Sequence, residues 1–459
     1  MVRDADRFRG EMRRRNRVFP THTAKYGHRE AEPAVSNPGD TGVPGPETVS
    51  VAFLGRVALL AVAAYAFNTG FKIHGGPATL WVVLEMLLYG AALGCLLASF
   101  LVRDGWSPRI QIVVALLLGT LITVGVGYEI TVLNPNYATD VMAFAHGGAE
   151  ILLDGNNPYA ASAEEVDEIT GRFGVVPTRT ADGGVIDWLI SYLAMHLLSY
   201  TTLLALGFSD LRWGTLIVEL VALAVIWRAL SPKGRLVAPL VLLVEPFLTV
   251  VFTGGGVTDW LWVLPVAVAA ISLHRRSYGY AGIALGLACA VKQHPWFAVP
   301  FVLIWVVQTL RSEHDGRLSI AARAFLVGFL GGLAAGFVVP NLPFVLWDAE
   351  AWFQGMFSPA LGGMVADGHG LTLLVSRHLM DLPSEFFLVL VVAGLVGAMA
   401  VYVRYFHRLQ NLLIPPAIMF LSYRSLHSYF VLWMPIALLW LDLRVRWSRQ
   451  SHTVSMAET

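Results

Sequence analysis

Long runs of apolar residues, separated by short polar segments, fill the chain from residue 51 onward. Several of these runs reach the roughly 20 residues that an α-helix needs to cross a bilayer. The pattern predicts an all-α, polytopic transmembrane protein with about twelve spans. We expect the spans over residues 51–68, 79–101, 110–132, 212–230, 236–252, 260–273, 278–291, 296–310, 321–340, 384–403, 409–422 and 428–443.

Composition supports a membrane protein. Of the 459 residues, 56% are hydrophobic and only 14% are charged, and the mean hydropathy is +0.61. A soluble domain carries about a quarter charged residues. The net charge of zero gives no indication of a nucleic-acid partner. Cys95 and Cys289 both lie in apolar runs, so the sequence predicts neither a disulfide framework nor a metal site.

The two ends of the chain differ from its middle. Residues 1–50 are rich in Arg, Pro, Gly and Glu and poor in large apolar side chains, which is typical of a flexible tail. We therefore predict a cytoplasmic tail over 1–50, a transmembrane domain over 51–445 and a second cytoplasmic tail over 446–459.

The distribution of basic residues predicts the orientation in the membrane. If the apolar stretch 185–207 is re-entrant or lies on the outer interface, twelve spans remain and both termini are cytoplasmic. Of the 32 Lys and Arg residues, 24 then lie on cytoplasmic segments, 7 lie outside, and Arg56 lies near the inner edge of the first span. Basic loops resist translocation, so this orientation is favoured over one in which 185–207 crosses fully. It places the unusual polar loops on the extracytoplasmic side of the plasma membrane.

The stretch "TDVMAFAHGGAEILLDGNNPYA", residues 139–160, lies in the first long outer loop. Apolar residues repeat at helical spacing over 141–153, which predicts an amphipathic helix on the outer surface. Gly155 and the following Asn-Asn-Pro should end this helix. Asp140 stands at its start, where it is either a cap for free backbone N–H groups or a functional carboxylate.

The spacing of Asp140, Phe144, Gly155, Pro158 and Tyr159 resembles the first outer loop of the GT-C superfamily of membrane glycosyltransferases. The likeness is to the polyprenyl-phosphate-mannose-dependent branch, which includes phosphatidylinositol mannoside mannosyltransferases. Two further stretches resemble this branch in the same order. They are a Gly-rich loop, hairpin and Lys-x-x-Pro over 254–305, and "LSYRSLHSYFVLWMPIAL" over 421–438.

The resemblance implies a GT-C-like fold and a hexosyltransferase of the cell envelope. Such an enzyme moves a sugar, in this branch mannose, from a polyprenyl phosphate to a hydroxyl of an extracytoplasmic glycolipid, glycan or glycoprotein. It implies membrane lipid around the chain, no nucleic acid and no cofactor. Asp140 matches the position of the catalytic general base. Asp367 and His369 are too few ligands to predict a metal.

The remaining candidates have competing interpretations. Lys292, Arg424 and His427 are predicted to bind the donor phosphate, because a phosphate leaving group gains negative charge. Lys292 could instead extend its side chain to the lipid headgroups, and the other two could lie in a solvated turn. Candidates for substrate binding are Asp259, which could equally cap a helix, and Tyr159, His294 and His369.

Two other classes of function stay open at this point. A lipid-linked sugar flippase or transporter without catalysis would place its ionisable groups near the bilayer midplane, between repeats. The sequence shows no clear inverted repeat. A non-catalytic scaffold of an envelope complex would make Asp140 replaceable.

Overall fold

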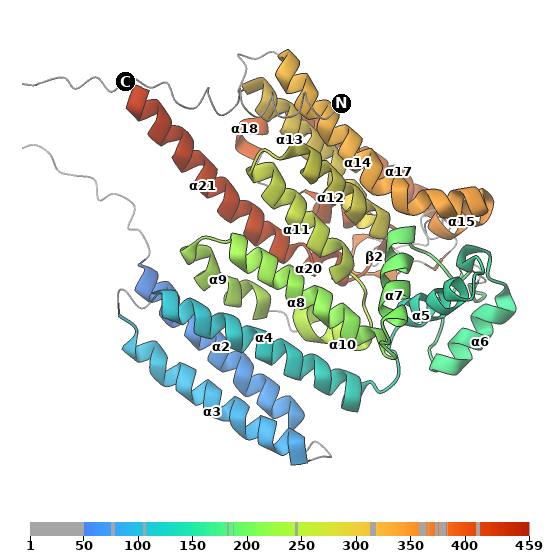
Figure 1. Cartoon of the computed structure of the whole chain (residues 1–459), viewed down its shortest axis with the longest axis horizontal. Helices are drawn as coiled ribbons and strands as arrows, with labels where there is room; N and C mark the ends of the chain where they lie inside the picture. Colours follow the sequence, from blue (N-terminus) through green and yellow to red (C-terminus); the bar gives the residue numbers. More distant parts are fainter. Residues whose placement is uncertain are drawn as a thin grey trace, which may run out of the picture. The chain divides into compact units, whose positions relative to one another are not determined.

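The computed structural model describes most of the chain after the first tail. The described residues are 50–74, 79–103, 107–180, 183–186, 188–243, 247–312, 318–357, 364–365, 367–371, 375, 382, 384–409 and 414–458. The predicted tail 1–50 lies outside them except for Ser50. Over the described residues the chain is almost entirely helical, which confirms an all-α, polytopic membrane protein (Figure 1).

Seven helical segments are long and apolar enough to cross a membrane in the described part of the chain. An eighth is obtained if Pro232–Leu243 and Leu248–Gly255 form one span with an 82° bend. The seven segments are Val51–Ile73, Thr79–Leu101, Ser107–Leu133, His294–Ser312, Ile320–Trp347, Glu385–Arg404 and Ser428–Arg446.

The segments are built from the following elements. The N-terminal spans are α2 (Val51–Ile73), α3 (Thr79–Leu101) and α4 (Ser107–Tyr128), the last continued by the π-turn η1 (Glu129–Leu133). The middle of the chain forms α8 (Leu211–Ala229), α9 (Pro232–Leu243), η3 (Phe247–Val251), α10 (Phe252–Gly255), α11 (Trp260–His274) and α12 (Tyr278–Val291). The C-terminal part forms η4 (His294–Phe297), α13 (Val299–Ser312), α14 (Ile320–Trp347), α17 (Ser384–Arg404), α18 (Phe406–Leu409), α19 (Pro415–Met419), α20 (Ser428–Val431) and α21 (Met434–Glu458).

Four of the twelve predicted spans differ from this set. Helix α8 carries Arg212, Glu219 and Arg228 within its 19 residues, which is too many charges for an independent span. Helices α11 and α12 have 15 and 14 residues, fewer than the roughly 20 that match the hydrocarbon core. In the predicted span 409–422 the structure describes Leu409, which belongs to α18, and 414–422, where helix covers only Pro415–Met419.

Helices α12 and α14 pack with their backbones in direct contact. A β-carbon placed on Gly282 would lie 2.1 Å from the Phe329 carbonyl oxygen, and one on Gly336 would lie 2.3 Å from that of Ile283. Small residues permit such a close approach inside a membrane, where helices associate through packing rather than through the hydrophobic effect. Glycine at these positions thus fixes α12 against a much longer helix.

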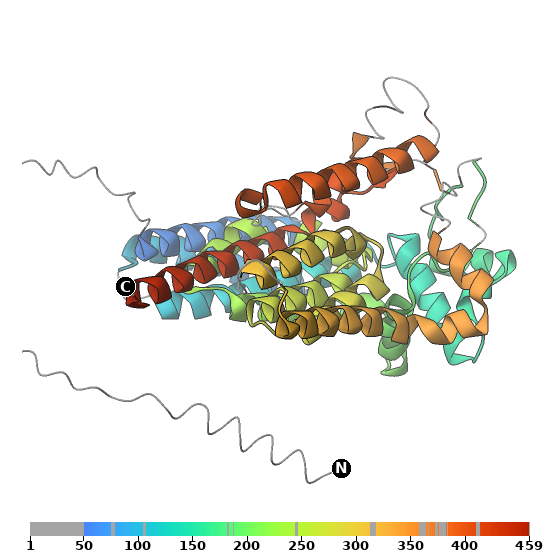
Figure 2. The ribbon, with the colours of Figure 1, turned by 90° about the horizontal axis from the view of Figure 1, so that it is seen from above.

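The polar loops form short helices at one end of the bundle. These are α5 (Asp140–Leu153), η2 (Pro158–Ala160), α6 (Ala163–Phe173), α7 (Ala194–Ala205) and α15 (Ala349–Phe357). Figure 2 shows α5, α6 and α15 gathered beyond the same ends of the long helices. The 12 residues of α7 span about 18 Å at 1.5 Å per residue, too little to cross a bilayer. This agrees with the prediction that 185–207 does not cross fully.

Helix α5 has the predicted bounds but not the predicted exposure. Gly155 has φ of +81° just after its C-cap, as a helix-ending glycine should. All residues from Met142 to Ala149 are buried, on every side of the helix. The interpretation of an amphipathic helix with a solvated face is therefore wrong for these two turns. The reason is that α6, α7 and the segment before α7 cover this helix: Ile169 of α6 lies against Gly147, and Ile190 and Leu197 lie against Gly148.

A few strand pairings join the loops at the end of the bundle where α5 lies. Strand β1 (Asp367–Gly368) pairs in parallel with β2 (Arg424–Ser425). The described residues form no other strands. Isolated bridges join Arg179 to Val185 and Thr180 to Met364. Segments that are far apart in sequence are thereby held together next to α5.

Candidate active site

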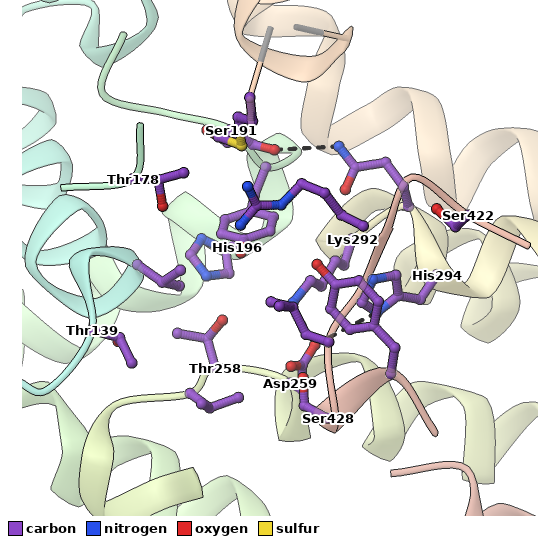
Figure 3. Close-up of a pocket in the computed structure, with 18 of the residues that line it drawn as sticks. Thr139, Thr178, Ser191, His196, Thr258, Asp259, Lys292, His294, Ser422 and Ser428 are labelled. Atoms are coloured by element: carbon purple, nitrogen blue, oxygen red, sulfur yellow. Dashed lines mark hydrogen bonds and ion pairs between the residues drawn. The ribbon is translucent and has the colours of Figure 1, made fainter. Parts of the chain in front are cut away.

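A cavity of about 320 Å³ lies where the polar loops meet the helix ends. Its walls come from the start of α5, the segment before α7, the turns that precede α11 and follow α12, and the segment 422–429. Figure 3 shows side chains from these segments directed toward a common space. The predicted candidates among its lining residues are Asp140, Asp259, Lys292, His294 and Arg424.

Asp140 is held by a residue distant in sequence. The N-cap of α5 is Thr139, whose hydroxyl donates to the Gly256 carbonyl at 2.9 Å, so Asp140 is the first helical residue and not the cap. The Thr178 backbone N–H and hydroxyl both donate to Asp140 Oδ2, at 2.7 and 2.6 Å. Oδ1 receives no hydrogen bond from the described residues. The carboxylate is thus oriented through one oxygen and open through the other.

Lys292 and Asp259 form a buried ion pair. Lys292 Nζ donates to Asp259 Oδ1 at 2.7 Å, and the Trp262 indole N–H donates to the same oxygen at 2.8 Å. Lys292 is therefore not extended toward lipid headgroups. Asp259 occupies the N-cap position of α11, but its side chain makes no capping hydrogen bond. Both of the alternative interpretations for these residues are wrong, because the two side chains pair with each other.

Aromatic rings surround this pair. Lys292 Nζ lies 4.8 Å from the ring centre of Tyr192 and 5.2 Å from that of Tyr429, within the range of cation–π attraction. The His294 ring packs edge-on against Tyr429, with ring centres 3.7 Å apart. His294 Nδ1 lies 3.8 Å from Asp259 Oδ1, too far for a hydrogen bond. The pair is thereby shielded from water while it stays at the cavity wall.

Arg424 contributes a positive charge that is not balanced in this way. It belongs to β2, and its Nη1 donates to the Val365 carbonyl at 3.0 Å. It is half-buried. No carboxylate within the described ranges forms an ion pair with it, whereas the charge of Lys292 is matched by Asp259. Arg424 is therefore the stronger candidate for an anionic group.

Three predicted candidates lie outside the cavity lining. The Tyr159 side chain is buried, and its hydroxyl donates to the Tyr192 carbonyl at 2.8 Å. His427 packs against Phe252, with ring centres 5.7 Å apart, and His369 packs against His427 at the same distance. None of the three residues lines the cavity.

Several lining residues were not predicted from the sequence. Thr178 lies in a segment without hydrophobic periodicity. Thr258 lies in a Gly-rich turn, where no sequence pattern distinguishes it from its neighbours. His196 lies on α7, where burial, together with the positive charge of Lys292, lowers the pKa of its imidazole to about 3, so that it is neutral. The sequence did contain a signal for this site: Tyr192, His196 and Tyr200 stand at helical spacing in an otherwise apolar stretch.

Neither a metal cluster nor a known relative identifies the ligand of the cavity. Among the residues that the structure describes, no three His, Cys, Asp or Glu side chains are grouped closely enough to hold a metal ion. No protein-family model matches the chain, and no match is found among the curated proteins or the solved structures.

Proposed function

We propose that this protein transfers a sugar from a polyprenyl-phosphate donor to a hydroxyl of an extracytoplasmic glycolipid, glycan or glycoprotein. The observation that carries the proposal is the placement of Asp140, Lys292 and Arg424 around one cavity at the end of the helical bundle. The resemblance to GT-C mannosyltransferases makes mannose the proposed sugar. The proposal includes cytoplasmic termini and an outward-facing site in the plasma membrane.

Asp140 is the general base of the proposed reaction. An alcohol is a poor nucleophile, and removal of its proton in the transition state accelerates transfer by about 10²–10⁴-fold. Thr178 holds Oδ2 and leaves Oδ1 free to accept the proton. The acceptor oxygen bonds to the anomeric carbon while the bond from that carbon to the phosphate oxygen breaks. The electron pair of the broken bond leaves with the polyprenyl phosphate.

Arg424 and Lys292 contribute differently to the leaving group. Arg424 offers a charged guanidinium, which binds phosphate oxygens through two parallel hydrogen bonds. Lys292 uses one N–H on Asp259 and has two more donors, but the ion pair cancels most of its charge. Arg424 should therefore supply most of the electrostatic stabilisation, and Lys292 a fixed hydrogen bond.

The test is a transfer assay with several radiolabelled polyprenyl-phosphate sugars in membranes that contain the protein. Wild type should transfer one of them, and Asp140→Asn should lower turnover by about 10²-fold or more. Asp154→Asn is the matched control, since Asp154 is an exposed carboxylate at the other end of the same helix. Near-full activity of Asp140→Asn would sink the mechanism. Transbilayer movement of the labelled lipid without transfer would favour a transporter.

A further inference from the structure

Four polar side chains on one wall of the cavity are buried and incompletely satisfied. Their exposed fractions are 2% for His196, 1% for Thr258, 1% for Asp259 and 6% for His294. Within the described part of the chain, their atoms without a hydrogen-bond partner are His196 Nδ1 and Nε2, Thr258 Oγ1, Asp259 Oδ2 and His294 Nδ1. Figure 3 shows these four residues around the same space, together with Lys292.

Unpaired polar atoms in a protein interior are unfavourable, and most buried polar groups find a partner. Here five such atoms, from four residues, line a single cavity. A volume of about 320 Å³ exceeds what these side chains need for packing and falls within the range of small-molecule sites. The clustering indicates that a ligand supplies the missing partners.

The donors and acceptors of this wall define the chemistry of the ligand. A neutral imidazole offers one N–H donor and one acceptor nitrogen, and a threonine hydroxyl both donates and accepts. Asp259 Oδ2 accepts only, and the charge of its carboxylate is offset by Lys292. A wall with mixed donors and acceptors and little net charge suits hydroxyl groups better than it suits an anion.

The apolar part of the same wall is aromatic. The His196 ring packs against Tyr192, with ring centres 4.7 Å apart, and Tyr192 and Tyr429 flank Lys292 on two sides. Flat faces beside hydrogen-bonding groups fit a ring that has C–H faces and hydroxyl edges. Arg424, which faces the cavity from another segment, is not part of this wall.

We propose that His196, Thr258 and the free oxygen of Asp259 form a subsite for an uncharged, polyhydroxylated ring. Assignment of that ring to the sugar of the donor rests on the proposed function. The subsite itself rests on the unpaired atoms and the cavity. His196 and Thr258 thereby determine which sugar is accepted, while Arg424 holds the phosphate.

The experiment measures binding of octyl mannoside to the full chain in nanodiscs, with n-octanol as the reference for its alkyl tail. His196→Phe keeps a ring against Tyr192 and removes both nitrogens, and Thr258→Val keeps the shape and removes the hydroxyl. Each change should weaken saturable binding of octyl mannoside roughly tenfold. His196→Gln, which restores a donor and an acceptor, should recover part of the affinity. Because the removed atoms are unpaired, neither variant should lower the melting temperature.

A second probe, polyprenyl phosphate without a sugar, separates this subsite from the phosphate site. His196→Phe and Thr258→Val should bind it like wild type, and Arg424→Gln should lose affinity for it while it retains octyl mannoside. Equal octyl mannoside affinity in wild type, His196→Phe and Thr258→Val would overturn the subsite, and so would no binding above that of n-octanol. Binding of octyl mannoside without binding of any polyprenyl phosphate would keep the subsite and refute the proposed donor.

Discussion

The Lys292 ammonium lies 2.7 Å from the Asp259 carboxylate, and both side chains are almost completely buried. The two residues are 33 positions apart and meet because α11 and α12 form a hairpin whose open ends lie at the cavity. A charge buried in this way depends on its partner, since either group alone would remain without water or a counter-charge.

The ion pair should behave as one unit in stability measurements. Lys292→Met alone or Asp259→Leu alone should each lower the free energy of unfolding by about 3–5 kcal/mol, because an unpaired buried charge is left behind. The double variant should recover most of this loss, since an apolar pair needs no solvation. Thermal unfolding in detergent, followed by loss of tryptophan burial, measures all three. Additive losses in the double variant would show that the two charges do not depend on each other.

Thr178 should act as a positioning residue for Asp140. Thr178→Val removes the hydroxyl donor at 2.6 Å and keeps the backbone donor at 2.7 Å, so the carboxylate loses one of its two restraints. Turnover should fall about tenfold with little change in KM, because the loss of a hydrogen bond to a charged group is of this size. Thr178→Ser should restore turnover. A variant with unchanged kcat would show that the base is oriented by other contacts.

Arg424 and His427 should differ, although both were predicted to bind phosphate. Arg424→Gln should weaken binding of a non-reactive donor analogue about tenfold or more, because its guanidinium faces the cavity without a carboxylate partner among the described residues. His427→Ala should have a smaller effect, since its ring packs against Phe252 outside the lining. Equilibrium titration of the analogue compares the two variants. Equal losses would show that His427 reaches the donor after all.

His196 should make stability depend on pH. Burial lowers its pKa from an ordinary 6.5 to about 3. Between these values the unfolded chain binds a proton that the folded chain does not, so the free energy of unfolding falls as the pH falls through this window. Relative to His196→Gln, wild type should lose about 3 kcal/mol between roughly pH 7.5 and pH 4.5. The check is a comparison of melting at both pH values. Parallel curves would mean that His196 is already protonated or accessible in the fold.

The orientation in the membrane can be tested with single cysteines at exposed positions. A cysteine at Glu164, on α6, should react with a membrane-impermeant thiol reagent in intact cells, and a cysteine at Lys233 should not. Cys95 and Cys289 are buried and provide the low background. Labelling at both positions in intact cells would show that 185–207 crosses the membrane fully, and labelling at 233 alone would reverse the proposed sidedness.

The sequence predicts the helix ends beside the cavity well, and this is why it predicts much of the cavity. Asp140, Asp259 and Lys292 all stand where an apolar run starts or stops, and hydropathy alone locates such positions. Their pairing could not be predicted in the same way. That Lys292 meets Asp259, and that Thr178 meets Asp140, depends on how the hairpin and the loop return, and such long-range contacts leave no periodic signal.

Burial of α5 was missed for a related reason. The helical repeat predicts an apolar stripe that includes Gly148 and leaves out Gly147, yet Ile169 packs closely against Gly147 as well. His196 was missed because an isolated histidine in an apolar stretch is indistinguishable from a core residue until its unpaired nitrogens are seen beside a cavity.

The direct contact between the backbones of α12 and α14 bears on how the cavity can change shape. At Gly282 and Gly336 the helices touch without intervening side chains, so rotation of either helix would force backbone atoms into one another. Lys292 follows α12 immediately and is thus anchored to a rigid pair. Thr178 and Arg424 belong to loop segments whose described backbone pairings include two isolated bridges and a two-residue strand pair. The wall of the cavity that carries Lys292 is therefore held by direct backbone packing, whereas the walls that carry Thr178 and Arg424 rest on loop contacts.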